Sequence, residues 1–190
     1  MIRTYKKQFE SKKVEKIDNL IKRIKRIKMP GSVSKYYAHE LLLCLQAGAL
    51  LGSLCITSAL LEIFVRELAI KYSALASSNS DLYKKLALLQ KQLEEKRNLS
   101  FKQLINGLAS CGLFSEDDAE QAKEFYDSVR IPIHHGLPAR FVEIQNDIIA
   151  ALNEIFTFPI GMHEFEEVIE DRSLDLIEIV IGIIERNNFK

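Results

Sequence analysis

The sequence contains little of what builds β-rich folds or metal centres. Its 190 residues include eight Gly and four Pro, too few for a turn-rich β sandwich and typical of long helices. Tryptophan is absent, which excludes a tryptophan-based stacking platform. The three cysteines, Cys44, Cys55 and Cys111, form no C-x-x-C pair and no Cys/His cluster with zinc spacing. We therefore predict no metal site and no cofactor, and interpret the thiols as small buried groups in a reducing, cytoplasmic compartment.

Net charge is also absent, because Lys and Arg balance Asp and Glu over the whole chain. The charges are unevenly distributed, however. Residues 1–28 carry eleven Lys/Arg against three Asp/Glu, and residues 141–190 carry three against eleven. A basic arm of this kind suits a polyanion such as RNA. Alternatively, the two ends lie near each other and neutralise, which requires no partner.

A secretory signal is not predicted, because no apolar segment follows the basic N-terminus. Residues 41–61 form a run of 21 residues without a charge, which is long enough to span a bilayer. The run contains Gln46 and Gly48, and it is flanked by Glu40 and Glu62 rather than by basic residues. We therefore predict a buried core helix and no membrane association.

Apolar residues recur at helical spacing along most of the chain, which predicts an all-α, single-domain helical bundle of seven to eight helices over residues 1–190. A basic helix at 3–28 is stopped by Met29-Pro30-Gly31. A second helix starts with Ser32 or Ser34 as its cap and runs to about Tyr72, with a kink near Gly48 or Gly52. The remaining helices are predicted at about 82–97, 100–111, 115–130, 138–157, 162–170 and 173–187.

Two helix starts have specific capping patterns. Ser100 with Gln103 is a capping box, and Ser115 with Asp118 is a weaker version of the same pattern. The β-branched run 177–184 resembles a strand in composition, but its apolar residues share one helical face. We therefore predict a helix there as well.

Arg130, His134 and His135 form the one segment where a cation, two imidazoles and a backbone break coincide. Histidine exchanges a proton near neutral pH, and arginine stabilises charge that develops on a phosphate. These groups suffice for metal-free cleavage of a phosphodiester by a neighbouring 2′-hydroxyl. On an unbroken helix Arg130 and His134 share a face. Because Pro132 disfavours helical geometry before it, either histidine could face Arg130.

The heptapeptide Arg130-Ile131-Pro132-Ile133-His134-His135-Gly136 resembles the signature of the HEPN superfamily, an Arg followed by four to six residues and a His, often as Arg-Asn-Pro-x-x-His-Gly. The resemblance places the family's Arg, His and Gly on Arg130, His135 and Gly136, and its helical acidic residue on Glu62. An "F-x-x-L-I … G-L-F" pattern is also similar, here Phe101, Leu104, Ile105, Gly112, Leu113 and Phe114. The similarity covers roughly residues 34–155. The basic helix 3–28 and the acidic helices within 162–187 lie outside it.

The resemblance implies an all-helical homodimer whose Arg and His line a cleft at the dimer interface. Active members of the family are metal-independent ribonucleases, and many are toxins held by an antitoxin. Other members are non-catalytic modules that bind RNA, a nucleotide or a protein. The frequent Asn after the Arg is Ile131 here, which favours the non-catalytic alternatives, including a purely structural dimer that regulates a partner. The sequence retains the Arg, Pro, His and Gly of the signature, which favours ribonuclease activity.

Each candidate residue also has an ordinary structural interpretation. Arg130 could be a surface residue that closes a helix, where a cation interacts favourably with the helix dipole. His134 and His135 could be turn residues. Glu62 could pair with Arg66 one turn further along the same helix.

Overall fold

The computed structural model describes residues 2–75, 81, 84, 85, 88, 89, 91, 100–130 and 162–188. Among these residues, side chains are described from 11 to 72, from 100 to 130, from 172 to 188 and at the six separate positions between 81 and 91. This described part is all helical. It contains six α-helices and one π-helix and no strand, which confirms the predicted all-α class. The predicted helix at 138–157 lies outside the described residues. Of the helix predicted at 82–97, the described positions are helical.

The N-terminal helix α1 (Ile2–Arg26) ends just before the predicted Met29-Pro30-Gly31 break. Its apolar face is buried through Leu20 and Ile24. Val14, which shares the periodic pattern, is exposed instead. The apolar pattern therefore overestimates the buried length of this helix.

The uncharged run forms a hairpin of two helices, α2 (Ser32–Gln46) and α3 (Leu50–Leu75), rather than the predicted single kinked helix. The chain reverses at Gly48, whose φ of +69° is unfavourable for residues with a side chain. The Ala49 backbone N–H donates to the Cys44 carbonyl at 2.9 Å, which satisfies one of the last carbonyls of α2. Within the described part of the chain, no helix is long and apolar enough to cross a membrane.

The start of α2 is capped mainly from a distant part of the chain. The N-cap residue is Gly31 rather than Ser32 or Ser34, although Ser34 Oγ accepts from the Gly31 backbone N–H at 3.4 Å. Both Glu67 carboxylate oxygens, on α3, accept hydrogen bonds at 3.0 Å from the backbone N–H groups of Val33 and Ser34. A Cβ on Gly31 would overlap this carboxylate. Glycine at position 31 therefore makes room for the cap.

The helices α5 (Phe101–Ser110) and α6 (Glu116–Phe125) begin as predicted. Ser100 Oγ accepts from the Gln103 backbone, and the Gln103 side chain accepts from the Ser100 backbone, which completes the capping box. Ser115 Oγ accepts from the Asp118 backbone at 3.1 Å. A short π-helix, η1 (Tyr126–Arg130), continues α6 directly.

The C-terminal helix α8 (Met162–Arg186) is continuous, so the prediction of two helices at 162–170 and 173–187 is wrong. Its β-branched run is helical, as expected. One face of this run is buried through Leu174, Ile177, Val180, Ile181 and Ile184.

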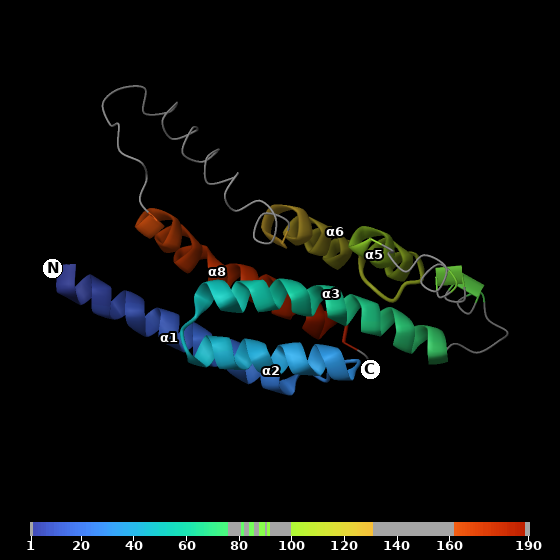
Figure 1. The fold of residues 1–190 in the computed structure, drawn as a ribbon, viewed down its shortest axis with the longest axis horizontal. Coiled ribbons are helices and arrows are strands. Elements are labelled where there is room, and N and C mark those ends of the chain that lie inside the picture. The colour runs from blue at the N-terminus through green and yellow to red at the C-terminus, as the bar shows by residue number, and fades with distance from the viewer. Residues whose placement is uncertain are drawn as a thin grey trace, which may run out of the picture.

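Helix α3 is the central element of the bundle. It packs against α2, α8, α5 and η1, while α1 packs against α2 and α8 (Figure 1). Its buried side chains include Leu60, Leu61, Phe64, Val65 and Leu68. This arrangement places the two chain ends on neighbouring helices and sets η1 against the middle of the molecule.

The basic and acidic ends of the chain pair with each other across α1 and α8. Lys16 forms ion pairs with Asp175 and, at 3.1 Å, with Glu178. Arg23 pairs with Glu178 at 2.9 Å and with Glu185 at 2.8 Å. The structure therefore supports neutralisation between the two ends, the alternative that needs no polyanion.

Candidate functional site

Two of the five candidate residues, Arg130 and Glu62, lie in the described part of the chain, and the structure brings them together. An ion pair of 2.5 Å joins Arg130 Nη2 to Glu62 Oε2. The other three candidates, His134, His135 and Gly136, lie outside the described residues. The distances and contacts of the site that follow are therefore those of Arg130 and Glu62.

Arg130 is the last residue of η1, and an aromatic stack that includes Tyr126, the first residue of η1, positions it. The rings of Phe101 and Tyr126 are parallel within 12°, with centroids 4.7 Å apart. The Arg130 Cζ atom lies 5.0 Å from the centroid of the Tyr126 ring, which is cation–π distance. A nearby ion pair of 2.6 Å between Lys102 and Asp127 also joins α5 to η1. These contacts fix the direction from which the guanidinium reaches α3.

Glu62 bridges two arginines. Its Oε1 accepts hydrogen bonds from Arg66 Nη2 at 3.0 Å and Nε at 3.3 Å, while its Oε2 contacts Arg130. Both interpretations of Glu62 from the sequence, as the partner of Arg66 and as the companion of Arg130, are thus realised at once. The three side chains carry a net charge of one positive unit.

The cluster is partly open to solvent. The side chains of Arg130, Glu62 and Arg66 are 23%, 19% and 31% exposed, respectively. Arg130 Nε is nevertheless buried and has no hydrogen-bond partner among the described residues. A buried donor without an acceptor is costly, so this atom marks a position where an incoming oxygen would be stabilised.

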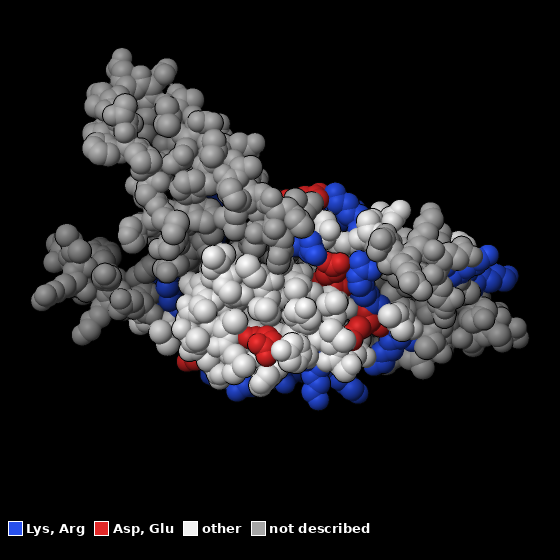
Figure 2. Space-filling model, viewed as in Figure 1, with Lys and Arg blue, Asp and Glu red and all other residues white. Residues whose placement is uncertain are grey.

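Figure 2 shows the setting of this cluster on the molecular surface. A broad, mostly uncharged area that includes an acidic side chain covers the α2–α3 turn, in agreement with the uncharged residues 41–61. Acidic and basic side chains gather beyond it, toward the second half of α3 and the side of α6.

A second ionic cluster joins α6 to the end of α8. Asp118 Oδ1 accepts from Arg186 Nε at 2.9 Å and Nη2 at 2.5 Å, and Oδ2 accepts from Asn187 Nδ2 at 2.7 Å. Asn187 Oδ1 in turn accepts from the Ser115 backbone N–H. Burial alone would raise the pKa of Asp118, but the hydrogen bonds from Arg186, Asn187 and Ser115 outweigh it and lower that pKa. The sequence predicted for Asp118 only a role in the helix cap with Ser115.

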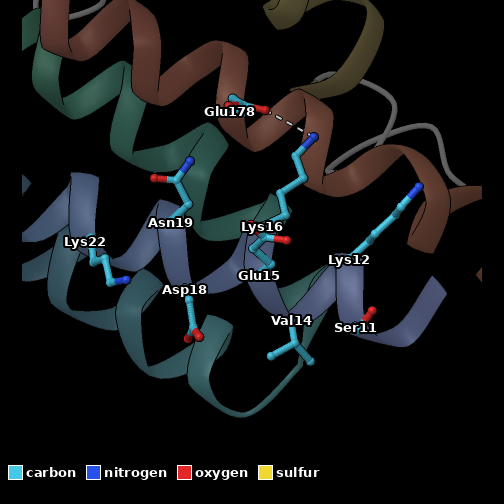
Figure 3. Close-up of a pocket in the computed structure, with 9 residues that line it drawn as sticks. All are labelled: Ser11, Lys12, Val14, Glu15, Lys16, Asp18, Asn19, Lys22 and Glu178. Carbon is cyan, nitrogen blue, oxygen red and sulfur yellow. Dashed lines mark ion pairs between the residues drawn. The ribbon is translucent and has the colours of Figure 1, made fainter. Parts of the chain in front are cut away.

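An open hollow of about 880 Å³ lies beside α1 and is distinct from the arginine cluster. All its lining residues come from α1 except Glu178 of α8: Ser11, Lys12, Val14, Glu15, Lys16, Asp18, Asn19 and Lys22. Lys16 reaches toward Glu178, while Val14 and Asp18 point away from α8 (Figure 3). Ligand sites have polar groups that converge, and here they diverge.

The cysteines and acidic residues suggest no metal centre in the described ranges. No group of three or more His, Cys, Asp and Glu side chains there could hold a metal ion. Cys44, Cys55 and Cys111 are free and half-buried, so the expectation of fully buried thiols is wrong. Burial raises the pKa of Cys55, with a smaller contribution from Cys44, which disfavours its thiolate.

Comparison of this chain with protein-family models, with curated proteins and with solved structures gave no match. The arginine–carboxylate cluster and the Arg130–Gly136 segment are therefore the features from which a function is argued.

Proposed function

We propose that this chain is a HEPN-like helical bundle of seven to eight helices that acts as a metal-independent endoribonuclease. The proposal places a homodimer in the cytoplasm, with Arg130 and His135 or His134 at the dimer cleft and an antitoxin as regulator. One observation carries the catalytic role of Arg130. Glu62 and Tyr126 hold its guanidinium in place immediately before the Pro132-Ile133-His134-His135-Gly136 segment.

In the proposed reaction, a neutral histidine removes the proton from the ribose 2′-hydroxyl. The 2′-oxygen then attacks the adjacent phosphorus, while Arg130 stabilises the negative charge that develops on the phosphoryl oxygens. The bond from phosphorus to the 5′-oxygen breaks, and the histidine that was protonated in the first step gives its proton to the leaving oxygen. The products are a 2′,3′-cyclic phosphate and a 5′-hydroxyl. Every step uses side chains that the sequence contains.

The test is cleavage of end-labelled total RNA by purified protein in excess EDTA. The wild type should cut, and Arg130→Ala and His135→Ala should each lower the rate at least about a hundredfold, the usual contribution of a general base or a charge-stabilising group. His134→Ala identifies which imidazole acts. Circular dichroism should show that each variant remains folded. Equal activity, or equal silence, in all preparations would remove the catalytic role.

A non-catalytic RNA-binding module is the second candidate. The ion pair between Arg130 and Glu62 favours it, because a neutralised arginine stabilises a phosphorane less well, and Ile131 points the same way. This candidate predicts salt-sensitive binding of RNA without cleavage, which the same preparations would show.

A further inference from the structure

The arginine cluster has the composition of an anion site that an internal carboxylate occupies. Arg66 and Arg130 come from different elements, α3 and η1, and converge on Glu62. A carboxylate and a phosphate present similar pairs of oxygen acceptors to a guanidinium. Glu62 therefore stands where a phosphate group could bind between the two arginines.

The carboxylate fills this place incompletely. The nearest contact of Glu62 with Arg130 is to Nη2, and the buried Nε donor has no partner among the described residues. A guanidinium binds a phosphate best through two parallel N–H groups. A tetrahedral oxyanion that approached Arg130 could therefore satisfy a donor that Glu62 does not reach.

Charge and access are consistent with exchange of the carboxylate for a phosphate. Removal of Glu62 from between the arginines would leave two positive charges, and one phosphodiester would restore the net charge of the cluster. All three side chains are partly exposed, so an incoming ligand can approach the cluster from solvent, and it reaches the buried Arg130 Nε once the guanidinium turns.

We propose that Glu62 is an internal competitor for the phosphate site, and that a phosphodiester of single-stranded RNA displaces it from Arg130 and gains Arg66 as a second contact. The proposal rests on the RNA ligand of the proposed function, but not on cleavage. It assigns Arg66 a binding role. Glu62 holds Arg130 in the RNA-free protein and acts there as a brake on binding.

The test is fluorescence anisotropy with a labelled 2′-O-methyl RNA oligonucleotide, which binds but cannot be cleaved through a 2′-hydroxyl. Glu62→Gln keeps the shape of the side chain and removes its charge, so it should tighten binding about tenfold, the size of one charged hydrogen bond. Arg66→Gln should weaken binding about tenfold. It should also reduce the salt slope by about 0.7, as expected for one lost contact to a single strand.

Two matched controls separate the site from overall charge. Glu116→Gln makes the same charge change in an exposed residue at the opposite end of α6 from η1. Arg172→Gln does so for an exposed arginine on α8. Neither should change the affinity more than about twofold, because exposed and distant charges are screened by salt.

The direction of the Glu62→Gln effect decides the proposal. Weaker or unchanged binding would mean that Glu62 positions Arg130, and the competitor role would be wrong. If Glu62→Gln fails to fold, the predicted loss of affinity and of salt slope in Arg66→Gln still tests the site, and absence of RNA binding in every variant overturns it. Tighter binding by Glu62→Gln without RNA cleavage by the wild type would retain the phosphate site and reject the ribonuclease.

Discussion

The Asp118 cluster and the Glu62 cluster differ in how completely their polar atoms are hydrogen-bonded. Around Asp118, both carboxylate oxygens have donors, the side chain is 4% exposed, and the neighbouring Asn187 is bonded at both ends. Around Glu62, two arginines share one carboxylate whose side chain is 19% exposed, and Arg130 Nε has no partner among the described residues. A saturated network has nothing to offer a ligand, whereas an unsaturated one does.

This difference distinguishes the structural role of the Asp118 cluster from the binding role proposed for the Glu62 cluster. The Asp118 cluster fastens the start of α6 to the end of α8, two elements far apart in the sequence. The Glu62 cluster holds Arg130 but leaves one buried donor, Nε, without a partner among the described residues. The same chemical groups, arginine and carboxylate, therefore do different work according to burial and the number of partners.

The largest expected effect is on stability, and it distinguishes the two clusters. Asp118→Ala should lower the free energy of unfolding by about 2 kcal/mol. It leaves one N–H of the buried Asn187 amide without an acceptor, while the other keeps the Ile183 carbonyl. Glu62→Ala should cost less than about 1 kcal/mol, because Arg66 and Arg130 can turn toward water. Urea denaturation of both variants measures the two values.

Arg172→Ala, on the exposed surface of α8, serves as the control for both variants and should leave the unfolding curve unchanged. If Glu62→Ala proved as costly as Asp118→Ala, the open cluster would be structural, and its phosphate-binding role would lose its physical basis.

A smaller effect should appear in the pH dependence of stability. Because the folded-state pKa of Asp118 is lowered, the unfolded chain binds this proton more tightly, and ionised Asp118 stabilises the fold above the unfolded pKa. That contribution is constant from about pH 7 to about pH 5 and is lost as the pH falls below about 4 toward the folded pKa.

The measurement is the difference in unfolding free energy between the wild type and Asp118→Asn, taken from urea curves at several pH values. The gap should remain constant at neutral pH and narrow in acid. A gap that widened in acid would mean that the hydrogen bonds around Asp118 favour its protonated form, and the assignment of Arg186 and Asn187 as its donors would be wrong.

Features that depend on neighbours in the sequence were predictable. The caps formed by Ser100 with Gln103 and by Ser115 with Asp118 join groups three residues apart, so their spacing alone identifies them. The stop after α1 follows in the same way from Pro30 and Gly31. Helical periodicity likewise identified the β-branched part of α8 as helix.

Features that depend on distant neighbours were not predictable. Glu67 replaces the expected serine cap of α2 from more than thirty residues away, and no local pattern signals it. Asp118 and Arg186 are 68 residues apart, so only the packing of α6 on α8 reveals their pair. The contact between Glu62 and Arg130 had no basis in spacing either, and only the family resemblance placed the two residues in one site.

The smallest expected effect concerns the ion pairs between α1 and α8, which are intermediate between the two clusters. Arg23 is well paired with Glu178 and Glu185, like Asp118, but these partners are partly exposed, like Glu62. Arg23→Gln should therefore cost less than about 1 kcal/mol at low salt. The loss should vanish near 1 M salt, where the Debye length falls to about 3 Å. The cost of Asp118→Ala should persist there, because the Asp118 carboxylate and its Asn187 partner are buried. Urea denaturation at both salt concentrations measures this contrast.

If the cost of Arg23→Gln persisted at high salt, the arginine would stabilise the α1–α8 contact through packing rather than charge, and charge neutralisation would not explain why the two ends of the chain meet.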